Sequence, residues 1–291
     1  PIRKPLADKL PATSIVFAEH LFLALYGLPV LLWQRRTLQR LSSRGWLALL
    51  VIAWGASGLA TVLFTAAFRI GNPTTVILLQ KVQPLIAVLL AAALLRERLP
   101  RLYWPCFVAA LAGAYLVSFG RDVLEPLWLL PRERILTALL ALSAATLWGS
   151  ATVLGRYVLT TVPFPVLAAA RFVLALPFLA VLALVEGTFV RTFTVGLAQD
   201  APRLFFLALV PGLIAMLVYY LGLRHTRASY ATLAELAFPA LAIVVNWLTL
   251  GATIDLVQLA GFVILWMAIT ALSWIPAPAP AGEPRPATPV T

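Results

Sequence analysis

The sequence predicts an all-α, polytopic integral membrane protein. Of its 291 residues, 62% are hydrophobic and only 11% are charged, which is far from the balance of a soluble domain. Long apolar runs recur along the chain, and only short polar connections separate them. Because runs of about 20 apolar residues match the thickness of the bilayer core, this pattern predicts serial helical crossings of a membrane.

Nine apolar segments are each long enough to cross a membrane as a helix. At a rise of about 1.5 Å per residue, roughly 17 to 24 residues span a hydrocarbon layer of about 30 Å, and tilt absorbs the excess. The Pro/Ala-rich tail over residues 276–291 is predicted to be disordered. The predicted segments are Thr13 to Trp33, Trp46 to Phe68, Pro73 to Leu95, Tyr103 to Phe119, Ile135 to Val158, Pro163 to Val185, Phe205 to Leu223, Ala228 to Leu250 and Ile254 to Ile275.

The composition also excludes several classes of site. The single cysteine, Cys106, rules out an internal disulfide and a thiolate metal cluster, and His20 and His225 are too distant in sequence for a histidine-rich metal site. We therefore expect no metal, no cofactor and no nucleic-acid partner. The net charge of +11 is explained by basic residues that flank apolar segments, where they orient the chain and contact anionic lipid.

Basic residues predict the orientation of the chain, because short loops rich in Lys and Arg stay in the cytoplasm. Such clusters follow the first and the third apolar segments, so we expect both of these loops, and the C-terminus, on the cytoplasmic side of the cell (inner) membrane. The residues of the two clusters are Arg35, Arg36, Arg40 and Arg44, and Arg96, Arg98 and Arg101.

The chain contains an internal repeat. Arg69 and Arg224 lie 155 residues apart, as do Pro84 and Pro239, and this offset aligns the second, third and fourth apolar segments with the last three. The sequence therefore predicts two related halves, residues 1–120 and residues 135–275, joined by a loop over residues 121–134.

The repeat also predicts that the first half lacks its first helix. In the second half, the helix that contains Trp148 comes first, and its first-half partner would lie almost wholly before Pro1. An intact protein would then have five helices in each half. Because five is an odd number, the halves would insert with opposite topology, which is the inverted-repeat design of many secondary transporters.

Short sequence patterns recur in a fixed order along nearly the whole chain. Trp148-Gly149-Ser150 precedes Arg156, Ala170-Arg171-Phe172 opens the next helix, and Leu95-Arg96-Glu97-Arg98-Leu99 closes the third segment. Together with the paired prolines, these patterns resemble the EamA-like group of ten-helix permeases in the drug/metabolite transporter superfamily. The resemblance implies export or exchange of metabolites, amino acids or drug-like amphiphiles by alternating access, without identifying the substrate.

Seven polar or ionisable side chains fall inside the predicted membrane spans. An ion at the bilayer centre costs about 2.5 to 3.5 kcal/mol on insertion scales, so such groups normally face the protein interior and are paired. From the repeat we predict two pairs, Glu19 with Lys81 and Arg171 with Glu235. The alternative is that these groups are structural ion pairs between helices, or that they snorkel to the interface. The seven residues are Glu19, His20, Gln80, Lys81, Gln83, Arg171 and Glu235.

Prolines within two of the spans are candidate hinges. On the predicted third helix, Gln80, Gln83 and Pro84 share one face, with Lys81 about 100° away from Gln80. Pro84 and its repeat partner Pro239 each free a backbone carbonyl one turn earlier in a helix. This predicts either a kink that acts as a hinge or an acceptor that faces a ligand at membrane depth.

Deep aromatic residues are further candidates for lining a site, although most aromatics near segment ends fit an interfacial belt. Core packing is the alternative for Trp54, Trp148, Tyr219, Tyr230 and Trp247, which lie deeper in the spans. We predict a substrate site near the bilayer midplane. Its predicted lining residues are Gln80, Gln83, Trp148, Arg171, Tyr230 and Glu235.

The predicted function is that of a secondary-type permease, monomeric or homodimeric, for a small metabolite, amino acid or drug-like molecule. Export or exchange is the expected direction, and Glu19 or Glu235 would carry the proton if transport is proton-coupled. A channel or a non-transporting membrane scaffold is the alternative. An intramembrane enzyme is a distant third, because the sequence offers no nucleophile motif, no acid pair on facing helices and no metal triad.

Overall fold

The computed structural model describes residues 3–71, 76, 79–95, 99–119, 132–235, 237 and 256–273. Within these ranges every regular element is a helix, which confirms the all-α fold class. The predictions for Pro239, Trp247, Arg96 and Arg98 lie outside the described residues, as do those for the Pro/Ala-rich tail and for most of the loop between the halves.

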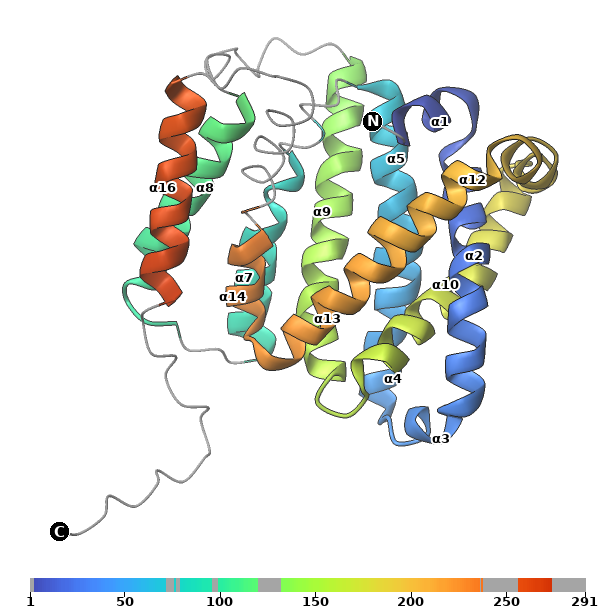
Figure 1. The fold of residues 1–291 in the computed structure, drawn as a ribbon, viewed down its shortest axis with the longest axis horizontal. Coiled ribbons are helices and arrows are strands. Elements are labelled where there is room, and N and C mark those ends of the chain that lie inside the picture. Colours follow the sequence, from blue (N-terminus) through green and yellow to red (C-terminus); the bar gives the residue numbers. More distant parts are fainter. Residues whose placement is uncertain are drawn as a thin grey trace.

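Long helices stand side by side through the molecule, with α8 and α16 at one end and α2 and α10 at the other (Figure 1). The elements before residue 120 are α1 (Arg3–Lys9), α2 (Ala12–Trp33), α3 (Arg35–Leu38), α4 (Ser43–Leu50), η1 (Val51–Leu59), α5 (Ala60–Ile70), α7 (Gln83–Leu94) and α8 (Tyr103–Phe119). The later elements are α9 (Arg132–Val158), α10 (Phe164–Val185), α11 (Phe189–Arg191), η3 (Thr192–Leu197), α12 (Ala198–Leu207), η4 (Ala208–Ile214), α13 (Ala215–His225), α14 (Ala228–Glu235) and α16 (Leu256–Ser273).

Five helical stretches among the described residues are long and apolar enough to cross a membrane. Three shorter apolar helices lie in α7, α8 and α16. This supports the predicted integral membrane protein. The five stretches are Ala12–Trp33, Ser43–Ile70, Ile135–Val158, Phe164–Val185 and Phe189–His225.

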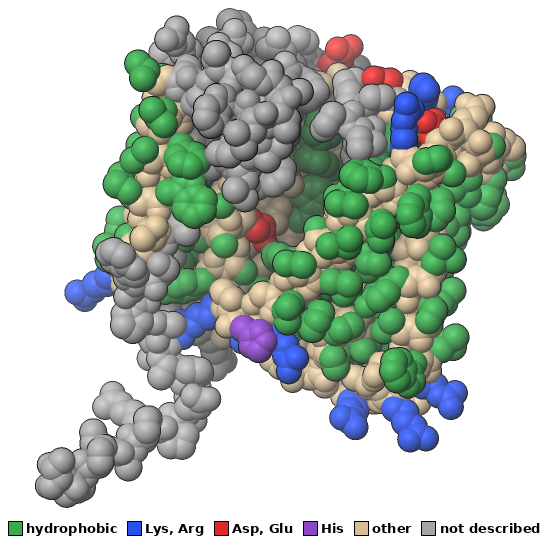
Figure 2. Space-filling view, viewed as in Figure 1, with side chains coloured by type: hydrophobic (Ala, Val, Ile, Leu, Met, Phe, Trp, Pro, Cys, Tyr) green, Lys and Arg blue, Asp and Glu red, His purple; other side chains and the backbone are tan. Residues whose placement is uncertain are grey.

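The outer surface has the polarity expected of a protein surrounded by lipid. Hydrophobic side chains cover much of the right half of the face in Figure 2. The exposed apolar residues of the protein include Leu209 of η4 and Val218 and Leu221 of α13. Lys and Arg side chains lie along the lower edge of this view, where α3 with Arg35 and Arg36 lies in Figure 1, whereas the upper edge shows both acidic and basic side chains.

Glycines permit close packing at two helix contacts that matter for the architecture. A Cβ atom added to Gly113 of α8 would come within 2.8 Å of the Gly261 carbonyl oxygen in α16. A Cβ atom added to Gly149 of α9 would come within 2.9 Å of the Gln83 carbonyl oxygen at the start of α7. Because small residues let helix backbones approach in a membrane, the second contact brings α9 directly against the polar residues of the third segment.

Two helix boundaries are set by familiar local chemistry. Ser42 caps α4, because its side-chain oxygen accepts a hydrogen bond from the Gly45 backbone N–H at 3.2 Å. After α10 the chain reverses at Gly187, which has a φ of 67°, and the Thr188 N–H then donates to the Ala183 carbonyl at 2.8 Å. A positive φ is readily adopted by glycine, so this helix ends with the common left-handed C-terminal turn.

π-helical segments occur at matching places in the two longest helical stretches. η1 ends at Leu59 and η4 ends at Ile214, which is 155 residues later and therefore the same offset as the sequence repeat. Within η1, the Ala56 carbonyl accepts the indole N–H of Trp148 at 2.9 Å. π-helical turns are rare and often mark functional sites, and nothing in the sequence had indicated these two.

The structure corrects the predicted position of Pro84. The third segment is not one continuous helix, because a turn at residues 81–82 precedes α7, which begins at Gln83. Pro84 is therefore in the first turn of a helix and not in its middle. Proline is well suited to this position, since its fixed φ matches a helix and it has no N–H to leave unpaired.

The seventh membrane span also begins earlier than the predicted Phe205. The chain is helical from Phe189, with a kink near Asp200 and Pro202. Phe189 and Phe193 pack on Phe17 of α2, with ring centroids 5.6 and 6.2 Å apart. Asp200 itself has non-helical backbone angles, with φ −121° and ψ 18°, so the chain bends sharply between the stretch from Phe189 and the rest of α12.

Candidate functional site

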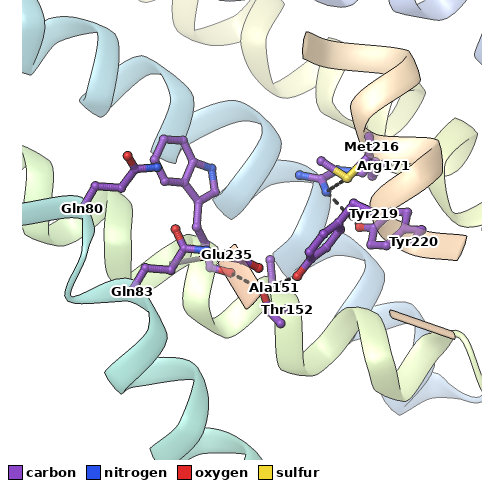
Figure 3. Close-up of a pocket in the computed structure, with 10 residues that line it drawn as sticks. Gln80, Gln83, Ala151, Thr152, Arg171, Met216, Tyr219, Tyr220 and Glu235 are labelled. Atoms are coloured by element: carbon purple, nitrogen blue, oxygen red, sulfur yellow. Dashed lines mark hydrogen bonds between the residues drawn. The ribbon is translucent and has the colours of Figure 1, made fainter. Parts of the chain in front are cut away.

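A pocket of about 250 Å³ lies between α7, α9, α10, α13 and α14, and the residues that line it are drawn in Figure 3. Figure 2 shows the molecular surface hollowed in this central region, with an acidic side chain visible inside the hollow. This volume is slightly below the usual range of small-molecule sites, about 300 to 1,000 Å³, so the pocket suits a compact ligand. The lining residues are Gln80, Gln83, Trp148, Ala151, Thr152, Arg171, Met216, Tyr219, Tyr220 and Glu235.

Arg171 of α10 holds one end of the pocket and is only 6% exposed. Its Nε donates to Ser57 Oγ at 2.6 Å, and its Nη1 donates to the Tyr220 hydroxyl at 2.9 Å and to Met216 Sδ at 3.0 Å. The guanidinium also lies 5.6 Å from the centroid of the Tyr220 ring. The contacts join α10 to η1 and α13, so the position of the cation is fixed from several sides.

Glu235 of α14 holds the other end of the pocket within a polar network. Its Oε2 accepts a hydrogen bond from Gln83 Nε2 at 2.8 Å, and its carboxylate is also hydrogen-bonded to the Tyr219 side chain. The Tyr219 hydroxyl lies 2.9 Å from Thr152 Oγ1. In Figure 3 these side chains converge from different helices, so the network connects α7, α9, α13 and α14.

Trp148 of α9 contributes its ring to the pocket. Its indole N–H is already bound to the Ala56 carbonyl at 2.9 Å, and the ring packs at a steep angle on Phe64 with centroids 4.9 Å apart. A molecule in the pocket would therefore meet the apolar surface of the indole and not its hydrogen-bond donor.

Five of the six residues predicted from the sequence to bind substrate line this one pocket, and Tyr230 is the exception. Tyr230 packs on Tyr103, with ring centroids 5.7 Å apart, beside the apolar cluster between α8 and α16. The five that come together are Gln80, Gln83, Trp148, Arg171 and Glu235.

The predicted ion pair between Arg171 and Glu235 is not formed among the described residues, although both side chains line the same pocket. Arg171 contacts Ser57, Met216 and Tyr220, whereas Glu235 contacts Gln83 and Tyr219. Lys81 lies close enough to Glu235 for the two charges to attract each other. The pairing of Glu19 with Lys81 stays a prediction.

Glu19 and His20 are buried in α2, at 5% and 4% exposure, and neither lines the pocket. His20 Nδ1 lies 2.8 Å from the Val16 carbonyl, and its ring meets the edge of Phe172, the neighbour of Arg171 in sequence. His20 therefore lies at the interface between α2 and α10.

Sequence reasoning missed five lining residues, namely Ala151, Thr152, Met216, Tyr219 and Tyr220. Thr152 follows Trp148 by one helical turn, so helical spacing could have indicated it. The sequence marks Tyr219 as a deep aromatic, for which core packing was the favoured explanation. Among the described residues, no group of three or more His, Cys, Asp or Glu side chains is placed to hold a metal ion.

Comparison with known proteins identifies the family. The model of the EamA-like transporter family matches residues 2–119 and again residues 135–274. The riboflavin transporter ImpX of Fusobacterium nucleatum subsp. nucleatum is 32% identical over 220 residues, which cover 75% of this chain and 72% of the relative. A solved crystal structure with 18% sequence identity shares the fold, with a TM-score of 0.72 over 94% of this chain and 92% of the other. The chain therefore belongs to the EamA-like transporter family and is a membrane transporter of a small metabolite.

Proposed function

We propose that the cargo binds in the pocket between Arg171 and Glu235 and crosses the membrane by alternating access, with no chemical change to it. The observation that carries this proposal is the composition of the pocket, because a buried cation, a carboxylate, two amides and several aromatic rings converge within the membrane-spanning part of the fold. Ionisable groups inside a membrane are costly and typically mark the path of a substrate or an ion.

The two predicted halves, residues 1–120 and 135–275, are the moving parts in this proposal. Gln80 and Gln83 come from the first half, and the other lining residues come from the second. Helices at equivalent places in the repeat pack on each other, namely α2 on α10, α7 on α14 and α8 on α16. Such packing is expected of an inverted repeat whose site lies at the interface of the halves.

The break before α7 is the candidate hinge on the first-half side. The turn at residues 81–82 and Pro84 at the start of α7 interrupt the helix next to Gln80 and Gln83. Discontinuous helices supply the binding groups in many transporters. We propose that α7 moves about this turn when the pocket changes the side to which it opens.

The cargo that fits these walls is a compact metabolite with a planar ring system and polar edges. The relative named a riboflavin transporter makes a flavin the first molecule to test. The ring of Trp148 offers an apolar surface, and the amides of Gln80 and Gln83 offer both donors and acceptors. Export or exchange is the proposed direction, with Glu235 or Glu19 as the carrier of a coupling proton.

We further propose that the basic edge with α3 faces the cytoplasm of the cell membrane and that the C-terminus lies on this side. Lys and Arg gather at that edge (Figure 2), as the rule for short cytoplasmic loops requires. Reagents that modify only the outer surface of intact cells should therefore leave a cysteine introduced at Arg36 unlabelled.

Counterflow of labelled riboflavin in proteoliposomes tests the proposed function. Unlabelled riboflavin inside the vesicles should accelerate entry of the labelled compound, because an alternating-access carrier returns faster when loaded. A channel would show flux without acceleration from the opposite side, and a scaffold would show no flux above that of empty vesicles. Either of these results would overturn the proposal for a flavin cargo.

A further inference from the structure

We propose that the cargo carries an oxyanion, a phosphate ester or a carboxylate attached to its ring system, and that this group binds the guanidinium of Arg171. This inference rests on the proposed function, since it concerns the same pocket. It also goes beyond that function, because riboflavin itself is uncharged at neutral pH.

The hydrogen bonds of Arg171 leave part of the guanidinium without a partner. An arginine side chain carries five N–H donors. Nε is bound to Ser57, and Nη1 is bound to both Tyr220 and Met216. Nη2 has no hydrogen-bond partner in the described part of the chain, although the residue is only 6% exposed. Two donors of a deeply buried cation are therefore available at the wall of the pocket.

The groups around Arg171 do not neutralise its charge. Ser57 and Tyr220 offer hydroxyl oxygens, Met216 offers a weak sulfur acceptor, and Phe172 and Tyr220 offer ring faces at 5.8 and 5.6 Å. None of these contacts is a carboxylate. A buried charge without an opposite charge is costly, and an anionic ligand would remove this cost when it binds.

The carboxylate at the other end of the pocket already interacts with side chains of the protein. Glu235 is hydrogen-bonded to Gln83 and Tyr219 and is attracted by Lys81. Arg171 and Glu235 thus face the same space, but the negative charge is shared with a second cation, whereas the hydrogen bonds of Arg171 within the described residues go to uncharged side chains. Arg171, Lys81 and Glu235 together carry two positive charges and one negative charge. The excess positive charge favours an anionic cargo.

The arrangement also indicates how an amphipathic anion would lie. Figure 3 places Arg171 and Met216 on one side of the view and Gln80 and Gln83 on the other, with Tyr219 and Thr152 between them. An oxyanion at Arg171 would allow a ring to lie along the aromatic walls with its polar edge toward the two amides. Arginine binds carboxylate and phosphate oxygens with charge-assisted hydrogen bonds, which are stronger than neutral ones.

A contribution of Arg171 to helix packing alone is the alternative. That role is served by Nε and Nη1, which connect α10 to η1 and α13. It does not require Nη2 at the pocket wall, and it predicts no preference between charged and neutral ligands. Ligand preference therefore distinguishes the two roles, whereas loss of stability on substitution does not.

Binding of matched ligand pairs to the purified full chain tests the proposal. Riboflavin 5′-phosphate is compared with riboflavin, and indole-3-acetate with indole-3-acetamide, by microscale titration in detergent. The acid of at least one pair should bind about tenfold or more tightly than its neutral partner, the size of one charge-assisted hydrogen bond. Arg171→Met should abolish this difference in affinity between the acid and its neutral partner. Arg36→Met removes the same charge from the exposed α3 and should leave the difference in affinity unchanged.

Each outcome decides between the proposals. If the neutral compound of both pairs binds as tightly as the acid or more tightly, the proposal of an oxyanion on the cargo is wrong. Binding of riboflavin in that case would still support the proposed function. If no compound of either pair binds, the oxyanion proposal and the flavin-like cargo both fail. The wild-type comparison needs no variant to fold. Arg171→Lys adds a check. Lysine keeps the positive charge but lacks the planar pair of guanidinium N–H donors, so this variant should retain a reduced preference for the acid.

Discussion

The two ends of the pocket are built differently. At one end, Arg171 is 6% exposed and is fixed by Ser57, Met216 and Tyr220. At the other end, Glu235 belongs to a hydrogen-bonded network that includes a residue of α7, which starts just after a break in its helix. In the proposed mechanism, the rigidly held charge recognises the cargo, whereas the network between the two predicted halves is broken and remade when they move.

The largest effect is expected at the rigid end. Arg171→Met should lower cargo uptake about tenfold to a hundredfold, because hydrogen bonds to a charged group contribute about 1.5 to 3 kcal/mol each. Initial rates of uptake into proteoliposomes measure this loss, with Arg36→Met as the matched control. Uptake by Arg171→Met at the wild-type rate would show that this end does not recognise the cargo.

A different kind of change is expected at the networked end. Glu235→Gln keeps groups that can bond to Gln83 and Tyr219 but removes the charge that attracts Lys81. Exchange of cargo should persist, while uptake driven by a pH gradient should fall about tenfold if Glu235 carries the proton, about the effect of removing one charge-assisted interaction. Measuring both fluxes on one preparation separates the two effects. Gradient-driven uptake by this variant at the wild-type rate would show that Glu235 does not carry the coupling proton. The same measurement on Glu19→Gln tests whether Glu19 carries it.

A smaller effect is expected when one support of Arg171 is removed. Tyr220→Phe deletes the hydroxyl that accepts from Nη1 while keeping the ring beside the guanidinium. Cargo affinity should fall about threefold to tenfold, less than for loss of the charge itself, since Ser57 still orients the side chain. Titration of the same ligands gives the affinity. A fall as large as that of Arg171→Met would mean that the cation is not held independently by η1.

The smallest effect is expected at Tyr230, which packs on Tyr103 outside the pocket. Tyr230→Phe should leave cargo affinity within about twofold of the wild type, since substitutions away from a site rarely exceed about 0.5 kcal/mol. The same titration provides the measurement. A tenfold loss of cargo affinity would show that Tyr230 belongs to the binding site, as the sequence had predicted.

The cost of polar groups in lipid explains which parts of the pocket the sequence could predict. Gln80, Gln83, Arg171 and Glu235 stand out in apolar segments, because placing them in hydrocarbon is unfavourable. Met216 and Tyr220 carry no such signal, since both are as acceptable in a packed core or against lipid as in a pocket. Their role becomes visible only through the guanidinium that they contact.

Pairing and helix interruptions were harder to predict than the spans. The repeat aligns Glu19 with Arg171 and the segment of Lys81 with that of Glu235, but it does not give the direction in which each side chain points. Arg171 bonds to hydroxyl groups, and not to the nearest acid in the pattern. Likewise, no sequence motif indicated η1 or η4, and the hydrogen bond from Trp148 to the Ala56 carbonyl in η1 became visible only in the structure.

Access to the pocket from the two sides of the membrane tests the central claim most directly. Thr152→Cys, in a chain whose single cysteine is replaced by Cys106→Ala, places a thiol of similar size in the pocket wall. Alternating access predicts that membrane-impermeant thiol reagents label this residue from either face of oriented vesicles, and that cargo added on one side slows labelling from that side. Labelling from one face only, whether or not cargo is present, would contradict alternating access through this pocket.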